Sequence, residues 1–382
     1  MSVEAALSLF AAASDGAFAI DSEQRVTYWN AAAEGILGYS AGEAVGKLCW
    51  ELLQGCTLAG VNICKAKGSI YSSVREGNPV QHFDLCMRHQ QGHTILVNVS
   101  TIALLDPGEG KPQGLVHLIR PLQVQEAAPG MLHIHLLGQT EVRRADGSLV
   151  EGPLWQRAKV RALLAYLALA ERHPIEREVL LDMLWPKMDH EGALRNLNTT
   201  VYNLRHSLEP GLAKGAASRY IFQEGGHYWL GGAGPHWLDI KAFKVGIRRA
   251  RIEPDAKRAI ATYEKALAYY RGEYLADLSE TGIYSAGEQE RYREWYLSAL
   301  EEVGVLYEQE GRRREATNVY LKALSAAPWR ETACQRLMRL LIRTGKPAEA
   351  RRHCHRLKVA LRELDLTPTR ETRLLCEELQ CE

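Results

Sequence analysis

A chain of 382 residues exceeds what one ordinary hydrophobic core serves, so its length predicts two or three domains. Hydrophobic residues make up 46% and charged residues 24%, which is the balance of a water-soluble globular protein. The formal net charge is +1, so bulk charge does not predict nucleic-acid binding. Any contact with DNA must come from a face that the fold positions.

The sequence gives no sign of a membrane or secreted protein. Its apolar runs are all shorter than the roughly 20 residues that span a bilayer. The first 18 residues contain Glu4 and lack a basic n-region, so we do not expect a signal peptide. The eight cysteines then indicate reduced thiols or ligands rather than a disulfide framework. We therefore expect a cytoplasmic protein.

Low-order stretches divide the chain into three modules. Gly- and Pro-containing segments at 123–130 and 231–235 are typical of linkers, whereas LDPGEGKPQG at 105–114 lies between two strand-like runs and predicts a hairpin loop. The expected modules are 1–122, 131–234 and 235–382. We expect the fold class to be α+β multidomain, with an all-α C-terminal part.

The first module has a mixed α/β pattern. A hairpin is predicted at 18–21 and 26–29, and two short helices at 31–38 and 41–46. Alternating apolar and polar residues at 80–89 and 94–104 predict antiparallel strands, and 115–122 supplies another.

The string DGAFAIDSEQRVTYWNAAAEGILGYSAGEAVGK resembles the opening of a PAS sensor domain. The residues that carry the resemblance are Asp15-Gly16, Asp21, Trp29-Asn30, Gly38-Tyr39-Ser40, Glu43 and Gly46-Lys47. The resemblance implies a curved antiparallel sheet with helices over one face, able to hold a ligand or to dimerise.

Four of the eight cysteines, Cys49, Cys56, Cys64 and Cys86, fall in this module. Four thiolates can hold zinc or an iron–sulfur cluster, but these spacings are not a CxxC arrangement. The segment 49–64 is similar to cysteine-bearing PAS domains, which often carry one further cysteine where this chain has Lys65–Gly68. Cys86 would have to replace it. The alternative is that the thiols are buried or incidental.

Other cofactors have weaker support. Gly46–Cys49 is similar to the flavin-reactive segment of light-sensing PAS domains, yet Trp50-Glu51 replaces the expected basic-aromatic pair and the last strand lacks the flavin-reading glutamine. Haem could bind through His82, His89, His93 or His117, although histidines are common in strands. An organic ligand remains a further alternative.

The second module begins with two strands at 132–138 and 141–144. Apolar residues at helical spacing predict helices at 159–170, 176–185 and 193–208, and a hairpin follows at 220–230. This order resembles the winged helix-turn-helix of Streptomyces antibiotic regulatory proteins. The matching strings are LLGQTEVR, KVRALLAYLAL, LLDMLWP, LNTTVYNLRHSLEP and YIFQEGGHYWL.

The helix at 193–208 has two contrasting faces. Its aliphatic stripe lies opposite Arg195, Thr199, Tyr202 and His206, with Asn196 and Asn203 beside them. Such side chains suit base edges and phosphates of double-stranded DNA. A merely solvated face normally carries Glu, which is missing between Arg195 and Ser207. We predict that this helix reads DNA, with Arg219 contacting phosphate and His227 lying at the tip of the wing.

The third module is helical and contains an internal repeat. Leu306, Gly311 and Ala316 recur 34 residues later as Leu340, Gly345 and Ala350, which is the tetratricopeptide period. The entrance, WLDIKAF at 237–243, resembles the start of the bacterial transcriptional activator domain. That family is tetratricopeptide-like and usually follows this kind of winged helix. Cys334, Cys354, Cys376 and Cys381 occupy helix-like positions and predict packing or tail residues.

The motif GxxxxGK[ST] is missing, as is a second histidine after His190-Glu191, so we expect no catalysis. We expect a one-component transcription regulator, in which the PAS module senses a ligand, redox state or metal. Homodimerisation and contact with RNA polymerase are the expected roles of the repeats. The rival hypothesis is a protein-interaction adaptor whose winged helix does not bind DNA.

Overall fold

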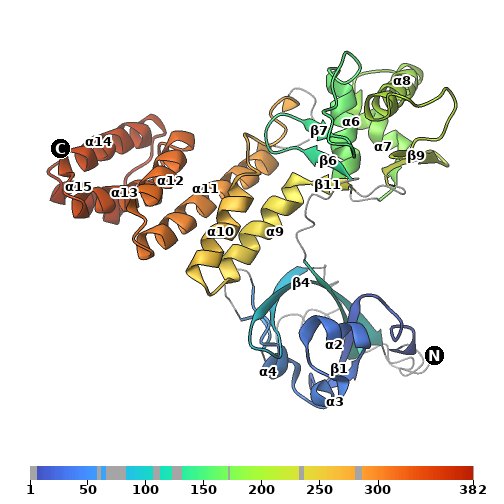
Figure 1. The fold of residues 1–382 in the computed structure, drawn as a ribbon, viewed down its shortest axis with the longest axis horizontal. Helices are drawn as coiled ribbons and strands as arrows, with labels where there is room; N and C mark the ends of the chain where they lie inside the picture. Colours follow the sequence, from blue (N-terminus) through green and yellow to red (C-terminus); the bar gives the residue numbers. More distant parts are fainter. Residues whose placement is uncertain are drawn as a thin grey trace. The chain divides into compact units, whose positions relative to one another are not determined.

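The computed structural model describes residues 7–57, 62–65, 83–105, 112–122, 131–170, 173–231, 236–279 and 286–381. They divide into two compact units, Met1–Gln123 with Arg248–Pro254, and Val124–Ile247 with Asp255–Glu382. Figure 1 shows the helices and strands of both units, coloured along the sequence. Among the described residues, no helix is both long and apolar enough to cross a bilayer.

The N-terminal unit contains one five-stranded antiparallel sheet with the order β2-β1-β5-β4-β3. The strands are β1 (Gly16–Asp21), β2 (Val26–Trp29), β3 (Phe83–Arg88), β4 (Thr94–Leu105) and β5 (Pro112–Pro121). Leu105 pairs with Pro112, so the predicted β4–β5 hairpin is confirmed. Short helices α2 (Ala31–Leu37), α3 (Ala41–Ala44) and α4 (Cys49–Leu53) complete the unit. The sequence analysis did not predict α4, which spans only five residues.

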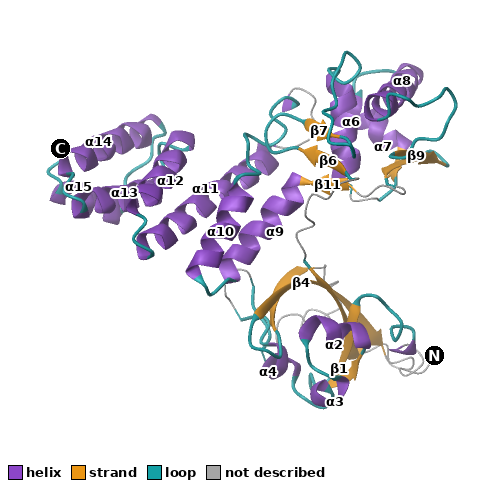
Figure 2. Cartoon of the chain, viewed as in Figure 1, coloured by secondary structure: helices purple, strands orange, loops and turns teal. Residues whose placement is uncertain are grey.

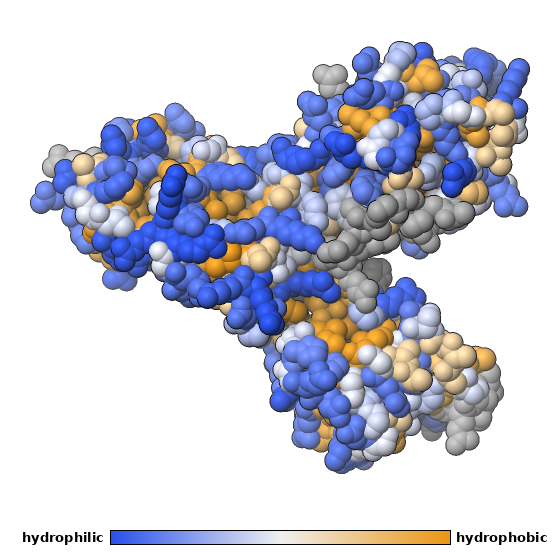
Figure 3. All heavy atoms as spheres, in the orientation of Figure 1, coloured by the Kyte–Doolittle hydropathy of each residue, from blue (hydrophilic) through white to orange (hydrophobic). Residues whose placement is uncertain are grey.

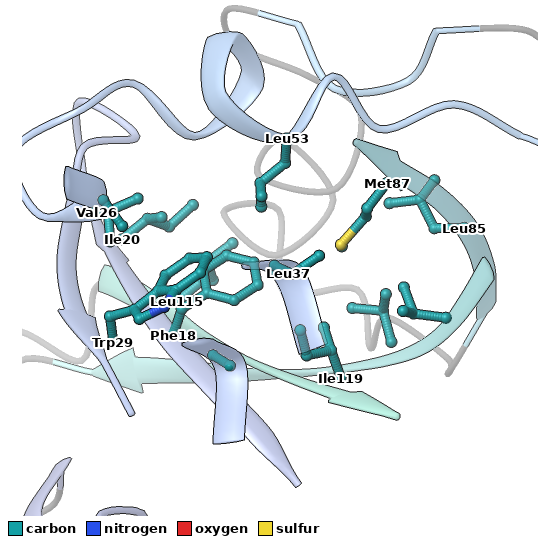
Figure 4. Close-up of a cluster of buried hydrophobic side chains, with 14 residues drawn as sticks. Phe18, Ile20, Val26, Trp29, Leu37, Leu53, Leu85, Met87, Leu115 and Ile119 are labelled. Atoms are coloured by element: carbon teal, nitrogen blue, oxygen red, sulfur yellow. The ribbon is translucent and has the colours of Figure 1, made fainter. Parts of the chain in front are cut away.

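The core of this unit lies on one face of the sheet. Phe18, Trp29 and Ile119 converge there with Leu37 of α2 and Leu53 of α4 (Figure 4). All five side chains are buried: the three strand residues point to the same face of the sheet, and the two helix residues cover that face. The PAS-like sheet with helices over one face is therefore confirmed.

The residues that carried the PAS resemblance have structural roles. Asn30 is buried, and its Oδ1 accepts the backbone N–H groups of Ala17 and Ala33, each at 2.8 Å. It therefore joins the start of β1 to the first turn of α2. Gly38 ends α2 with φ +81°, a conformation that glycine adopts without strain. Ser40 and Glu43 form a capping box at α3.

The second unit begins with the winged helix. Its helices are α6 (Ala158–Leu169), α7 (Arg177–Leu184) and α8 (His190–Leu208), drawn in purple in Figure 2. One sheet has the order β8-β10-β9, from β8 (Ile175–Glu176), β9 (Ile221–Glu224) and β10 (His227–Leu230). A second sheet has the order β11-β6-β7, from β6 (Leu132–His135), β7 (Glu141–Arg143) and β11 (His236–Leu238). The three predicted helices and the hairpin are confirmed.

Helices make up the rest of the unit: α9 (Asp239–Ile252), α10 (Ala256–Leu267), α11 (Ala286–Gln309), α12 (Arg313–Ala326), α13 (Glu331–Arg343), α14 (Pro347–Glu363) and α15 (Arg370–Glu378). The repeat glycines Gly311 and Gly345 have φ values of +74° and +75° and separate paired helices. Ala316 and Ala350 are fully buried. On the face shown in Figure 3, charged and polar side chains cover much of these helices, with apolar residues between them. The tetratricopeptide-like expectation is confirmed.

The winged helix and the helical module share backbone pairing. Strand β11, which leads directly into α9, lies parallel to β6, with Trp237 opposite His133. The carbonyls of Leu136 and Leu137 accept the backbone N–H groups of Leu275 and Arg271. The break expected at 231–235 therefore does not separate two independent folding units.

One cysteine prediction is wrong. Cys354 of α14 and Cys376 of α15 form a disulfide, although the sequence predicts reduced thiols; both are buried, as the predicted packing residues are. The expectation rested on chain length and compartment, and neither reports that the fold brings two particular helices together.

Candidate nucleic-acid interface and sensor cavity

Helix α8 begins at a capping residue and runs beyond its predicted start. Asp189 Oδ2 accepts the backbone N–H of Gly192 at 2.9 Å, which satisfies a donor left free at the helix N-terminus. The predicted aliphatic stripe is buried, since Leu197, Val201, Leu204 and Leu208 are each at most 3% exposed. The opposite face of α8 is consequently held toward solvent.

Four predicted residues share this solvent-facing side of α8. The side chain of Arg195 is 72% exposed, and Tyr202 is 54% exposed, an unusual position for a large aromatic residue. Thr199 is also exposed, and the His206 ring lies against the Tyr202 ring with centroids 4.0 Å apart. Glu191 forms an ion pair with Arg195 at 3.5 Å, so this face does carry an acidic residue one turn earlier.

The flanking asparagines differ from expectation. Asn203 is only 5% exposed, so its predicted place beside the open face is wrong. It lies 80° around the helix from Arg195, where the side chain is buried against the domain. Asn196 is half-buried, and its Nδ2 donates to Met188 Sδ at 3.1 Å. Asn198, which the sequence analysis omitted, is exposed. At 100° per residue, Asn198 lies 60° from Arg195, in the direction opposite to Asn203. This angle would have predicted its place on the exposed face.

Two arginines position α8, and the sequence analysis missed both. Arg205 donates from Nε and Nη2 to the carbonyl of Ile221, which ties α8 to the first strand of the wing hairpin. Arg144 donates to the carbonyls of Ser207 and Leu208 at the last turn of α8. A cation at this end also interacts favourably with the helix dipole. Motif patterns do not reveal such links, because the partners are backbone carbonyls.

The wing is the hairpin of β9 and β10, whose strands are joined by a two-residue turn. Gly225 and Gly226 have φ values of +56° and +81°, which a turn of this type requires and glycine supplies. His227 is half-buried beside this turn, with Nδ1 3.2 Å from the carbonyl of Gly225. Arg219 is exposed, and its backbone N–H donates to the carboxylate of Glu209 just after α8. The structure thus brings Arg219 close to the end of the helix.

The N-terminal unit contains a cavity of about 50 Å³, the space of a few water molecules. Phe18, Leu115, Cys49, Cys64 and His117 are among its lining residues. Burial lowers the pKa of His117 to about 4, so the imidazole is neutral at pH 7. Its Nδ1 lies 3.0 Å from Thr101 Oγ1. The cavity therefore offers an apolar wall, two sulfurs and one neutral ring.

The four N-terminal cysteines lie near one another in the fold. Cys49 and Cys64 line the cavity, whereas Cys56 and Cys86 pair through their backbones across two extended segments. Burial raises the pKa of Cys49, Cys64 and Cys86, and neighbouring thiols raise it further: Cys64 acts on Cys49, and Cys56 acts on Cys64 and Cys86. Among all described residues, no three His, Cys, Asp or Glu side chains gather as potential metal ligands. A metal site on these four cysteines therefore stays a prediction.

The predicted haem ligands are dispersed. His82 lies outside the described residues. His89 and His93 stack on each other at the β3–β4 hairpin, with centroids 4.2 Å apart, and neither lines the cavity. Of the three candidate histidines that the structure describes, His117 alone lines the cavity. A cavity of about 50 Å³ is far below the roughly 300–1,000 Å³ of sites for drug-sized ligands, so it suits a much smaller molecule than haem or flavin.

Three family models match successive parts of the chain. Residues 7–121 match the PAS fold. Residues 152–223 match "Transcriptional regulatory protein, C terminal". Residues 238–380 match the bacterial transcriptional activator domain.

Two curated relatives match more than half of the chain. The regulatory protein AfsR of Streptomyces coelicolor is 30% identical over 229 residues, which is 59% of this chain and 22% of AfsR. The transcriptional regulator RedD of the same organism is 27% identical over 223 residues, 58% of this chain and 62% of RedD. The chain thus spans only part of either relative.

A solved structure of EmbR from Mycobacterium tuberculosis, in complex with a low-affinity phosphopeptide, has a TM-score of 0.51 at 22% identity. It covers 65% of each chain, and at this identity it supports the fold alone. With the three family models, the order of domains is defined: the chain joins a PAS domain to a winged helix of the transcriptional-regulatory C-terminal type and a bacterial transcriptional activator domain.

Proposed function

We propose that this protein is a signal-responsive transcription regulator that binds double-stranded DNA through α8. The observation that carries the proposal is the exposed face of α8, where Arg195, Thr199 and Tyr202 stand opposite an aliphatic stripe that is buried from Leu197 onward. A helix of this kind fits the major groove, with arginine suited to guanine edges. Asn198 and His206 extend the same face, Arg219 contacts a phosphate, and His227 approaches the neighbouring backbone from the wing.

The PAS module, residues 1–122, acts as the sensor in this proposal. Its cavity takes a small, largely apolar molecule, with His117 as a neutral hydrogen-bonding group. The module 131–234 reads DNA, and 235–382 mediates assembly. We propose a homodimer on two half-sites about one helical turn apart, which then contacts RNA polymerase in the cytoplasm. The protein regulates without catalysis of its own.

The test is selection of bound duplexes from a random DNA library by the full-length protein, followed by fluorescence anisotropy on the enriched sequence. We expect one enriched motif, bound at least ~10³-fold more tightly than random duplex. Failure to enrich any sequence would support the adaptor hypothesis instead. Light scattering of the free and DNA-bound protein tests the dimer, since a monomer in both states contradicts it.

Two variants, one in α8 and one in α12, test whether α8 is responsible for the affinity for DNA. Combined Arg195→Ala and Tyr202→Ala changes should lower affinity for the enriched motif by at least tenfold, since each interaction with a base edge contributes about 1–3 kcal/mol. Arg314→Ala, which removes an equally exposed arginine from α12, is the matched control and should bind as the unmodified protein does. Equal loss in both variants would remove α8 from the interface.

A further inference from the structure

The last two helices of the chain are joined covalently. Cys354 in α14 and Cys376 in α15 form a disulfide whose Cα atoms lie 6.2 Å apart, within the span that a disulfide bridges without backbone movement. Both residues are at most 2% exposed. The bridge closes a loop of 22 residues that includes the turn between the two helices (Figure 1).

Helix α15 is attached at two places of different kinds. At its start, Thr369 donates from its backbone N–H and its hydroxyl to Glu331 of α13, at 2.8 and 2.7 Å. Thr372 accepts a hydrogen bond from Gln335 at 2.7 Å. The second half is held by the disulfide and by the burial of Leu375 and Leu379, and just after it the carbonyl of Cys381 accepts a hydrogen bond from Lys358 Nζ at 2.6 Å. Opening the disulfide would therefore remove the covalent constraint on this half while the start of α15 stays anchored.

A third cysteine lies close to this region. Cys381 is half-buried, and its backbone N–H donates to the carbonyl of Cys376 at 2.9 Å. Its Sγ lies 3.8 Å from the carbonyl of Arg351, one turn before Cys354 in α14. A partly exposed thiol thus lies close to the segments that carry the buried pair.

We propose that Cys354 and Cys376 are a site of reversible oxidation by a low-molecular-weight disulfide, and that their redox state fixes or frees the second half of α15. In the oxidation, the two cysteines lose two protons and two electrons and form one S–S bond. The reagent R–S–S–R accepts them and leaves as two R–SH molecules. Excess R–SH reverses the exchange and restores both thiols.

The experiment compares the full-length protein after treatment with oxidised glutathione and after treatment with reduced glutathione. Peptide mapping identifies the bond, and hydrogen exchange reports the protection of residues 370–381. We expect the Cys354–Cys376 bond in the oxidised sample and both thiols free in the reduced sample. Exchange at 370–381 should be faster on the order of tenfold after reduction, because the covalent constraint on the open state is lost.

Two variants separate this site from general effects of oxidation. Cys376→Ser should show the fast exchange under both conditions. Cys334→Ser, which removes another buried thiol, should respond as the unmodified protein does. The proposal is overturned if the pair stays oxidised in reduced glutathione, if another pair forms, or if exchange at 370–381 is the same in both states. The comparison of the unmodified protein alone decides the matter should a variant fail to fold.

Discussion

Asp239, the first residue of α9, accepts the backbone N–H of Leu137 with Oδ2 at 2.9 Å, across 102 residues of sequence. The same carboxylate also accepts the N–H groups of Leu136 and Ile240, and it is fully buried. A single side chain thus fixes the entrance of the helical module to the end of β6.

We expect Asp239→Ala to lower the free energy of unfolding by about 2–4 kcal/mol, because three buried backbone donors would lose their acceptor. Asp239→Asn keeps one acceptor oxygen and should cost less. Urea denaturation at pH 7.5 measures both. A loss below about 0.5 kcal/mol in the alanine variant would show that other groups satisfy these donors.

Asp277 offers a second test of the same junction. Its Oδ2 lies 2.7 Å from Arg161 Nε of α6, and its Oδ1 accepts the N–H and hydroxyl of Thr140. Both charged side chains are less than 20% exposed. Asp277→Ala should destabilise the protein by about 2–4 kcal/mol, because Arg161 would keep a largely buried charge without its partner.

The double variant Asp277→Ala with Arg161→Met provides the control for that experiment. It removes both charges, so it should recover part of the stability lost in the single variant. The cycle also needs the single variant Arg161→Met. If the free-energy losses of the two single variants simply add up in the double variant, the coupling energy of the ion pair is zero.

The stability of the N-terminal unit should depend on His117 under mildly acidic conditions. Burial lowers its pKa from the ordinary 6.5 to about 4, so the unfolded chain takes up the proton first as the pH falls. The stabilisation is complete above about pH 6.5 and is lost as the pH falls toward 4, by up to about 3 kcal/mol. Calorimetry at pH 7.5 and 5.0 should show a smaller loss for His117→Gln. His227→Gln, outside this unit, is the control and should lose as much as the unmodified protein.

Arg219 and Arg195 should differ in how they affect DNA binding. Arg219→Ala should weaken binding to specific and random duplexes alike and reduce the slope of log K against log salt by about 1, as loss of one phosphate contact does. Arg195→Ala should mainly relax the preference for one base. Titrations at several salt concentrations distinguish them, and an unchanged slope in Arg219→Ala would contradict the phosphate assignment.

Local patterns predicted most of the elements, and long-range contacts explain most of the differences. The stripe of Leu197, Val201 and Leu204 defines α8 because burial follows the helical period. Asn203 was misplaced because a residue at the edge of that stripe is buried or exposed depending on what packs beside it, which periodicity does not encode. The same limit applies to Arg144, whose partners at the end of α8 lie more than 60 residues away.

The cysteines show a different limit. Clustering along the sequence predicts one metal site, and the structure shows that Cys49 and Cys64 line the cavity while Cys56 pairs with Cys86 across extended segments. Conversely, Cys354 and Cys376 are 22 residues apart and meet because a turn brings α15 back against α14. Counting and spacing do not determine which sulfurs meet when helices and strands separate them.

The parallel pairing of β11 with β6 affects how this regulator can be taken apart by engineering. A DNA-reading cassette excised at residue 231 would leave β6 with an unpaired edge and would discard the acceptor at Asp239. Chimeras that exchange operator specificity should therefore transplant residues 131–279 as one block.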